Sequence, residues 1–283
     1  MLRRFPFVKG HGTENDFVLL PDHDGEAFPD LDPATVRRLT DRPSGLGADG
    51  VIRVVRSEAL PEGRDQADRA EWFMDYRNAD GSAAEMCGNG IRVLARYLWS
   101  AGLAPGPELP IGTRAGVRTV HEQADGSITV NMGGAVLVAI REPMTVTAGG
   151  RTWPINAVFA PNPHAVAFVD DLDDPGRLVD APRVLASTVF PHGANVEFAV
   201  VRGPRHVAMR VWERGVGETR SCGTGVCAAA FALMERDGSR PGSSYIVDVP
   251  GGRLTVMSRD DSSLLLTGPA VLGVSGTAEL PRV

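Results

Sequence analysis

Two glycine-rich turns contain the residues of this sequence that are best suited to carry out chemistry. They are Cys87-Gly88-Asn89-Gly90 and Cys222-Gly223-Thr224-Gly225, and each precedes an apolar stretch with helical spacing, at 91–98 and 226–233. A cysteine at the start of a helix lies near unpaired backbone N–H groups and the positive end of the helix dipole, which stabilises its thiolate. We therefore expect two reactive thiols.

The glycines of these turns favour the binding of an anion at the same place. Without side chains they allow a carboxylate to approach the N–H groups of the helix start. Two such turns facing each other would hold one carboxylate and place a sulfur on each side of its α-carbon. One thiolate could then remove a proton while the other thiol delivers one, because the ordinary pKa of cysteine, about 8.5, lies near neutrality. This is the geometry that inversion of an α-carbon requires.

The two turns belong to a longer internal resemblance. At the spacing that relates Cys87 to Cys222, Met74 corresponds to Met209 and Ala95 to Ala230. Each half thus runs from a strand through a Cys-Gly-x-Gly turn into a buried helix, as a duplicated fold would. The third cysteine, Cys227, lies among alanines within the second apolar stretch, and we assign it to packing.

The composition favours a two-domain enzyme that acts on small molecules. The chain has 283 residues, of which 43% are hydrophobic and 23% charged, and its net charge of -6 argues against nucleic acid as a partner. No apolar run is long enough for a membrane span, and the N-terminus lacks the features of a signal peptide, so we expect a cytoplasmic protein. Cysteine and histidine spacing predicts no metal site. Lys9 is the only lysine, which disfavours pyridoxal phosphate, and we expect no cofactor.

The pattern of short segments predicts an α+β fold rich in strands. A short helix is expected at 33–41, where Asp32 and Pro33 form a helix-start signal. Alternating apolar residues and glycine or proline boundaries predict strands at 49–55, 71–76, 117–121, 127–131 and 206–212.

Beyond the two turns, several motifs in their order along the chain resemble the diaminopimelate epimerases, which convert LL-2,6-diaminopimelate to the meso form for lysine and peptidoglycan biosynthesis. The resemblance runs from residue 11 to about 270. The motifs are His11-Gly12-Thr13-Glu14-Asn15-Asp16-Phe17, Gly45-Leu46-Gly47-Ala48-Asp49-Gly50, Arg77-Asn78-Ala79-Asp80-Gly81-Ser82, Glu85-Met86-Cys87-Gly88-Asn89-Gly90, Asn162-Pro163-His164, Asn195, Glu213-Arg214-Gly215-Val216-Gly217-Glu218-Thr219, Cys222-Gly223-Thr224-Gly225 and Pro250-Gly251-Gly252.

The resemblance implies two pseudo-symmetric α/β halves, each a curved, mostly antiparallel sheet wrapped around a central helix, with the active site in the cleft between them. The expected domains are 1–116 with 270–283, carrying Cys87, and 117–269, carrying Cys222. The last strand, around 271–280, would return to the first half. The oligomeric state is left open, with a homodimer as one alternative.

The resemblance also implies the site residues. Cys87 and Cys222 correspond to the two acid/base residues, and His164 and Glu213 to neighbours that tune the thiols. Gly88, Asn89, Gly223 and Thr224 would surround the reacting carboxylate. The other end of the substrate would be recognised by amide and charged side chains, since these offer donors and acceptors for an ammonium and a carboxylate. They are Asn15, Asn78, Asn162, Asn195, Glu213 and Arg214. Some family members have glutamine where Gly50 stands, so a contact at that position is in doubt.

Two other functions compete with diaminopimelate epimerisation. A racemase or epimerase of the proline or hydroxyproline type would also use two cysteines, but it should not need Arg214 and four asparagines to recognise a distal group. A non-catalytic protein that binds an amino acid is a more distant alternative. Loss of one thiol, or a bulky residue in a Cys-Gly-x-Gly turn, would indicate it, and neither is present.

Overall fold

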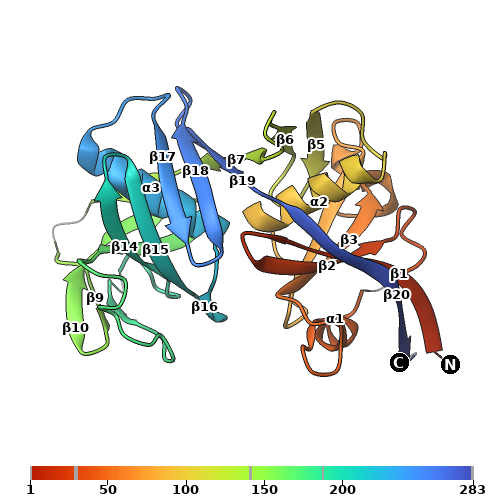
Figure 1. Ribbon diagram of the computed structural model, residues 1–283, viewed down its shortest axis with the longest axis horizontal. Coiled ribbons are helices and arrows are strands. Elements are labelled where there is room, and N and C mark those ends of the chain that lie inside the picture. Colours follow the sequence, from red (N-terminus) through yellow and green to blue (C-terminus); the bar gives the residue numbers. More distant parts are fainter. Residues whose placement is uncertain (1, 29–30, 140–141, 187, 282–283) are drawn as a thin grey trace. The chain divides into compact units, whose positions relative to one another are not determined.

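The computed structural model describes residues 2–28, 31–139, 142–186 and 188–281, and the chain forms two compact units (Figure 1). The first unit comprises Met1–Val130 and Pro269–Val283, and the second comprises Asn131–Gly268. The sequence-based division places the strand at 118–122 in the second half. In the structure this strand pairs with Glu108–Gly112 of the first unit. No helix in the described part of the chain is long and apolar enough to span a membrane.

The first unit is a sheet packed on one long helix, α2. Residues distant in sequence close this sheet, because β20 pairs antiparallel with β1 over nearly its full length (Figure 1). Its elements are β1 (Leu2–Gly12), β2 (Asn15–Pro21), α1 (Pro33–Thr40), β3 (Gly50–Arg56), β4 (Trp72–Asn78), α2 (Gly88–Ser100), β5 (Glu108–Gly112), β6 (Arg118–Glu122), the start of β7 (Ile128–Gly134) and β20 (Val271–Pro281), with short 3-10 helices at Ser57–Ala59 and Arg64–Gln66.

Buried apolar side chains explain why α2 lies against this sheet. Ile91, Val93, Leu94 and Leu98 are fully buried, and α2 contacts β1, β2, β3, β4 and β20. Burial of apolar surface on this scale is the main stabilising contribution to such a unit. The sheet therefore surrounds the helix and fixes the position of its first turn.

The second unit has its own sheet and its own buried helix, α3. Alanines in α3 allow close approach of the strands, and Gly238 ends the helix in the left-handed conformation, with φ of 61°. The elements are the end of β7, β8 (Val136–Val138), β9 (Thr145–Ala148), β10 (Arg151–Pro154), β11 (Asn156–Phe159), β12 (Pro163–Phe168), β13 (Arg183–Leu185), β14 (Asn195–Gly203), β15 (His206–Glu213), β16 (Gly217–Thr219), α3 (Gly223–Asp237), β17 (Ser244–Val249), β18 (Gly252–Ser258) and β19 (Ser263–Gly268).

The two units repeat one succession of strand pairings. In the first, β2 pairs in parallel with β3, β3 pairs antiparallel with β4, and β5, which follows α2, pairs in parallel with β4. In the second, β12 pairs in parallel with β14, β14 antiparallel with β15, and β17, which follows α3, in parallel with β15. The correspondence of the two Cys-Gly-x-Gly turns in sequence thus extends to the strands around them.

The elements predicted from sequence are present. The helix expected at 33–41 is α1, and the Asp32 carboxylate accepts hydrogen bonds from the Ala34 and Thr35 N–H groups at 2.9 and 3.0 Å. The five predicted strands correspond to β3, β4, β6, β7 and β15. The last predicted strand is β20, which returns to the first unit as expected. The prediction of a mixed fold with mostly antiparallel sheets is confirmed for the pairing within each unit.

Candidate active site

The α2 helix begins directly after Cys87, which adopts an extended conformation at its N-cap. The Gly90 N–H donates to the Cys87 sulfur at 3.4 Å. The thiol is partly buried, and its sulfur lies 3.8 Å from Oδ1 of Asn15. Cys87 is therefore held at the positive end of a helix dipole, as predicted.

A network of side chains fixes the first turn of α2. Asn89 is fully buried, donates to Asn15 Oδ1 at 3.1 Å, and accepts from Arg92 at 3.0 Å. The buried Arg92 also donates to the Gly88 carbonyl at 3.0 Å. The Asn89 side chain thus orients the turn through contacts within the protein, while its backbone N–H stands among those of the helix start.

Asp49 orients Asn15 through the amide nitrogen of Asn15, whereas Cys87 and Asn89 contact its amide oxygen. The Asn15 amide donates to Asp49 Oδ2 at 2.8 Å, and Arg42 lies 2.8 Å from Asp49 Oδ1. Asn78 stands on β4, and its amide donates to Ser82 Oγ at 3.0 Å. The first unit therefore brings Asn15, Cys87 and Asn89 into direct contact, whereas Asn78 is held separately by the 78–82 turn.

The α3 helix begins after Cys222 with the same extended N-cap conformation. The thiol is buried and its sulfur lies 3.4 Å from Thr224 Oγ1. Burial raises the pKa of the Cys222 thiol well above its usual value, and the negative charges of Glu213 and Glu197 raise it further. Hydrogen bonds from Thr224 and the Gly225 N–H act in the opposite direction but do not compensate.

This result corrects one expectation from the sequence. The helix start was expected to favour the thiolate, but at Cys222 burial and two carboxylates outweigh that effect. The structure therefore favours the neutral thiol at this position.

His164 is fully buried and lies between two hydrogen-bond partners of the second unit, the fully buried Glu197 and the partly buried Asn162. Its Nδ1 is 2.7 Å from Oε1 of Glu197, and its Nε2 is 3.0 Å from Oδ1 of Asn162. Asn162 thus contacts the histidine directly. The other Glu197 oxygen, Oε2, has no hydrogen-bond partner among the described residues.

Glu213 and Arg214 stand at the end of β15. Thr219 donates to the Glu213 carboxylate, and the Arg214 N–H donates to Asn195 Oδ1 at 2.9 Å. The Arg214 guanidinium is exposed and donates to the carbonyls of His192 and Gly193 at 3.1 and 3.3 Å. Asn195 therefore links the start of β14 to the end of β15, next to which the predicted recognition residue Arg214 lies.

Two residues of these networks were not identified as site residues from the sequence. Asp49 lies within a quoted motif, but nothing indicated that it would hold Asn15. Glu197 had a weak signal, since it is a carboxylate next to the apolar residues 198–201 of β14 and alternates with Asn195 on one face of the strand. Both contribute by fixing a residue that the sequence did identify.

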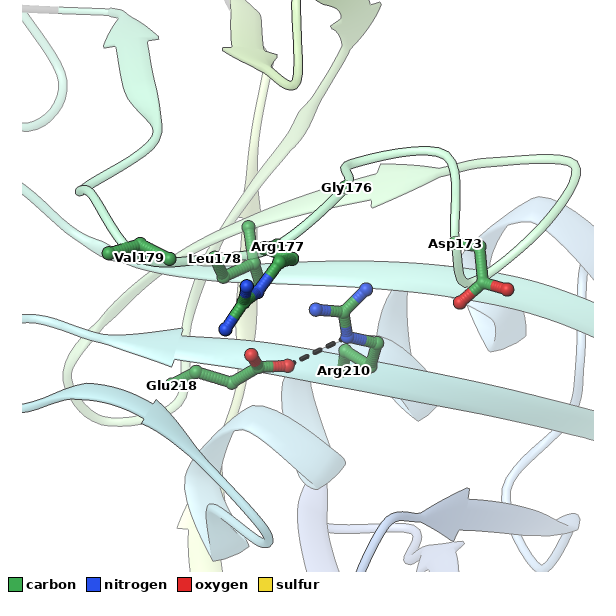
Figure 2. A pocket seen from close by; sticks show the side chains of 7 residues that line it. All are labelled: Asp173, Gly176, Arg177, Leu178, Val179, Arg210 and Glu218. Carbon is green, nitrogen blue, oxygen red and sulfur yellow. Dashed lines mark hydrogen bonds and ion pairs between the residues drawn. The ribbon is translucent and has the colours of Figure 1, made fainter.

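A surface pocket of about 550 Å³ lies elsewhere in the second unit. Figure 2 shows the ion pair between Arg210 and Glu218, at 2.7 Å, between Asp173 at one end and Val179 at the other. None of the predicted site residues lines this pocket. Among the described residues, no group of three or more His, Cys, Asp or Glu side chains could hold a metal ion.

Comparison with solved structures defines the class of fold. The chain matches a hydroxyproline epimerase from Agrobacterium vitis with a TM-score of 0.69 and 17% identity, over 98% of this chain and 92% of that one. It matches a PhzF-family phenazine biosynthesis protein from Bacillus anthracis with a TM-score of 0.69 and 18% identity, over 99% and 100% of the two chains. The protein therefore has the same mixed α/β fold as these two structures, mostly strands, with three α-helices in the described residues.

Sequence comparison identifies the family within this class. Residues 7–138 and 157–273 match the profile of the diaminopimelate epimerase family. The diaminopimelate epimerase of Streptomyces coelicolor is 54% identical over 281 residues, which cover 98% of this chain and 96% of the relative. That of Thermobifida fusca is 49% identical over 282 residues, covering 97% and 98%. The chain belongs to the diaminopimelate epimerase family, which confirms the resemblance found in its motifs.

Proposed function

We infer that this protein is a diaminopimelate epimerase, an isomerase that interconverts LL- and meso-diaminopimelate in lysine and peptidoglycan biosynthesis. The observation that carries this conclusion is close identity to curated diaminopimelate epimerases over nearly the whole chain. The retention of a cysteine at the start of both buried helices supports it, because each half of an inversion needs its own proton carrier. A proline-type racemase shares the fold at low identity only.

The proposed site places Cys87 and Cys222 on opposite faces of one α-carbon, in a cleft between two pseudo-symmetric halves. The N–H groups at Gly88, Asn89, Gly223 and Thr224 would bind the reacting carboxylate. The α-proton is removed by one thiolate, and the other thiol donates a proton to the opposite face. Each turnover therefore exchanges the protonation states of the two sulfurs and needs no cofactor.

Glu213 can make the pKa of the Cys222 thiol depend on whether substrate is bound. Its carboxylate raises the pKa of Cys222 because the thiolate would lie near a negative charge. An α-ammonium group of the substrate beside Glu213 would neutralise that charge. The pKa of Cys222 would then fall, and the thiolate would form next to the α-carbon that it must deprotonate. His164 would act on Cys222 through Glu197, its hydrogen-bond partner, because the charge of Glu197 also raises the pKa of Cys222.

The distal end of the substrate would be bound by Asn15, Asn78, Asn162, Asn195 and Arg214, while Glu213 would contact the α-ammonium of the reacting end. Support comes from Arg214, whose guanidinium is exposed and positioned by two backbone carbonyls. A guanidinium can bind a carboxylate through two hydrogen bonds. We further infer a cytoplasmic location, in keeping with a biosynthetic role, and keep a homodimer as an assembly to be tested.

Incorporation of solvent deuterium tests this function directly. Purified protein, dialysed against chelator and free of pyridoxal phosphate, should exchange the α-proton of diaminopimelate in D2O and convert the LL isomer to the meso isomer. L-Proline and trans-4-hydroxy-L-proline serve as controls and should not exchange. Exchange of proline at a comparable rate, or activity that returns only after addition of metal or pyridoxal phosphate, would overturn the proposal.

A further inference from the structure

Arg92, Asn89, Asn15 and Asp49 form one chain of hydrogen bonds beside Cys87. The Arg92 guanidinium donates to Asn89 Oδ1 at 3.0 Å, and the Asn89 amide donates to Asn15 Oδ1 at 3.1 Å. The Asn15 amide donates in turn to Asp49 Oδ2 at 2.8 Å. The chain thus begins at an arginine and ends at a carboxylate, with two amides between them.

The two ends of this chain allow only one direction of donation. A guanidinium has donors and no acceptor, whereas an ionised carboxylate has acceptors and no donor. Asn89 must therefore turn its oxygen to Arg92 and its nitrogen to Asn15. Asn15 must turn its oxygen to Asn89 and its nitrogen to Asp49. A reversed amide would place two donors or two acceptors face to face and would leave hydrogen bonds unmade.

Further contacts hold both ends of the chain in place. Arg92 is fully buried and also donates to the Gly88 and Pro269 carbonyls, at 3.0 and 3.4 Å. Oδ1 of Asp49 accepts from Arg42 at 2.8 Å, so both carboxylate oxygens serve as acceptors. Neither end can turn away without giving up these contacts, and either end alone is enough to set the direction.

The direction of the chain decides which atom of Asn15 faces the sulfur of Cys87. Asn15 Oδ1 lies 3.8 Å from this sulfur, and the Gly90 N–H donates to the same sulfur at 3.4 Å. A thiol satisfies both contacts, because its S–H donates weakly to the oxygen while its sulfur accepts from the N–H. An N–H2 group in place of the oxygen would instead donate to the sulfur and favour the thiolate.

We propose that Arg92 and Asp49 are positioning residues for the epimerisation and act through Asn89 and Asn15 to keep an amide oxygen facing the Cys87 sulfur. The inference rests on the function proposed above. The oxygen stabilises the protonated form of Cys87, which donates its proton to one face of the α-carbon in one direction of the reaction. Arg92 and Asp49 themselves need no contact with the substrate.

A double-variant cycle tests whether the two ends act together on Cys87. Arg92→Gln and Asp49→Asn each introduce an amide, which can donate or accept, and together they leave the net charge unchanged. Each single variant keeps one fixed end, so its effect on the alkylation of Cys87 by iodoacetamide should come from the lost charge alone. The double variant frees both amides. Its Cys87 should react on the order of 3- to 10-fold faster than the product of the single effects, since a hydrogen bond to the thiolate replaces one from the thiol.

Two readouts accompany this cycle. Cys222, followed by mass spectrometry in the same digest, should keep its parental rate of alkylation in the double variant. The kcat for diaminopimelate should fall by more than the two single losses combined. A role of Arg92 in stability alone would show in Arg92→Gln itself and would not depend on the residue at position 49.

Asp16→Asn is the matched control. The Asp16 carboxylate also accepts from Arg42, at 2.9 Å, but it is not a link in the chain. Its effect on Cys87 alkylation should therefore simply multiply with that of Arg92→Gln. An excess of the same size in both cycles, or no excess in the cycle with Asp49→Asn, would overturn the inference.

A second pair of variants covers the loss of a buried arginine. Where the unfolding temperature shows that Arg92→Gln does not fold, Asn89→Asp replaces it in the cycle with Asp49→Asn. The new carboxylate accepts from Arg92 but cannot donate to Asn15, so the same excess is expected, and rates that simply multiply would again overturn the inference. Failure of the parent enzyme to exchange the α-proton would instead overturn the proposed function, since alkylation needs no substrate.

Discussion

Nδ1 of His164 lies 2.7 Å from Oε1 of Glu197, and both side chains are completely buried. The other ring nitrogen faces an oxygen of Asn162, so the ring can donate to both partners only with a proton on each nitrogen. The Glu197 carboxylate also lies against the first turn of α3, where a Cβ atom on Gly225 would approach Oε1 to 2.7 Å. This pair therefore sets the charge beside Cys222 and the space beside its helix.

The two carboxylates near Cys222 should raise the pKa of its thiol by different amounts, Glu213 more than Glu197. Burial has the largest effect on its pKa, followed by Glu213 and then Glu197. Each charge disfavours the thiolate, so Glu213→Gln and Glu197→Gln should both lower the pKa, the former by more. The measurement is the pH dependence of Cys222 alkylation, followed by mass spectrometry of its peptide.

Asp248→Asn is the control for this series, because Asp248 forms another 2.7 Å pair with a histidine, His206, in the same unit. It should leave the Cys222 titration in place. A midpoint for Glu197→Gln equal to or above the parental one would show that the charge of Glu197 does not reach the thiol.

Variants of Cys87 and Cys222 should lose different steps of the reaction, because each thiol is expected to serve one face of the α-carbon. Cys87→Ala and Cys222→Ala should each abolish epimerisation while substrate affinity is largely kept, since backbone N–H groups hold the carboxylate. Cys87→Ser and Cys222→Ser should show opposite losses when α-proton exchange starts from LL- or from meso-diaminopimelate, because a hydroxyl is a far weaker base than a thiolate. Cys227→Ala should retain activity, as Cys227 is buried within α3. Near-parental turnover by either serine variant in both directions would rule out the two-thiol relay.

Gly225→Ala should destabilise the second unit. The added methyl group would meet the Glu197 carboxylate at the start of α3, and overpacking of this kind costs about 1–3 kcal/mol. Gly203→Ala is the control, because no atom lies within 4 Å of the Cβ that it would add. Thermal unfolding followed by calorimetry should show a lower transition for Gly225→Ala alone. Equal unfolding temperatures for the two variants would mean that the Glu197 carboxylate moves aside at no cost in stability.

Asp75 should make the first unit sensitive to acid. Its carboxylate is fully buried and lies 2.6 Å from Arg114, 2.9 Å from Arg53 and 3.1 Å from Arg77. Burial alone would raise its pKa, but the hydrogen bond from Arg114 and the charges of Arg53 and Arg77 outweigh this effect and lower it. A lowered pKa in the folded state gives stability that is present above the ordinary pKa, about 3.9, and is lost as the pH falls below about 4.

Hydrogen exchange of β3 and β4 amides between pH 3 and 7 measures this loss. Asp75→Asn should remove the pH-dependent part and lower stability throughout, by about 3–5 kcal/mol for a broken buried ion pair. The exposed Asp260→Asn serves as control. Protection factors of these amides, that is, exchange rates corrected for the intrinsic rate at each pH, that stay constant in the parent protein down to pH 3 would contradict the expectation.

Local signals made the two helix starts predictable. Cysteine and glycine at fixed spacing before an apolar helix place Cys87 and Cys222 at N-caps, and the structure has both there. Asp32 and Pro33 likewise define α1. These features depend on residues only a few positions apart, where backbone geometry and capping decide the outcome.

Contacts between distant segments were not predictable in the same way. The His164 and Glu197 side chains meet because β12 and β14 pair in parallel, which no local pattern specifies. The pKa of Cys222 depends on burial and on two carboxylates from other strands, so the helix-dipole argument alone gave the wrong direction.

The pairing of β20 with β1 has a consequence for synthesis on the ribosome. The partner of β1 is made only after the whole second unit, because Asn131–Gly268 lies between the two parts of the first. At 5–20 residues per second, this leaves the edge of β1 without β20 for on the order of tens of seconds. The second unit is contiguous and can complete its sheet earlier. We therefore expect the later-made unit to finish folding first, and chaperones that bind open strand edges to meet the nascent chain at β1.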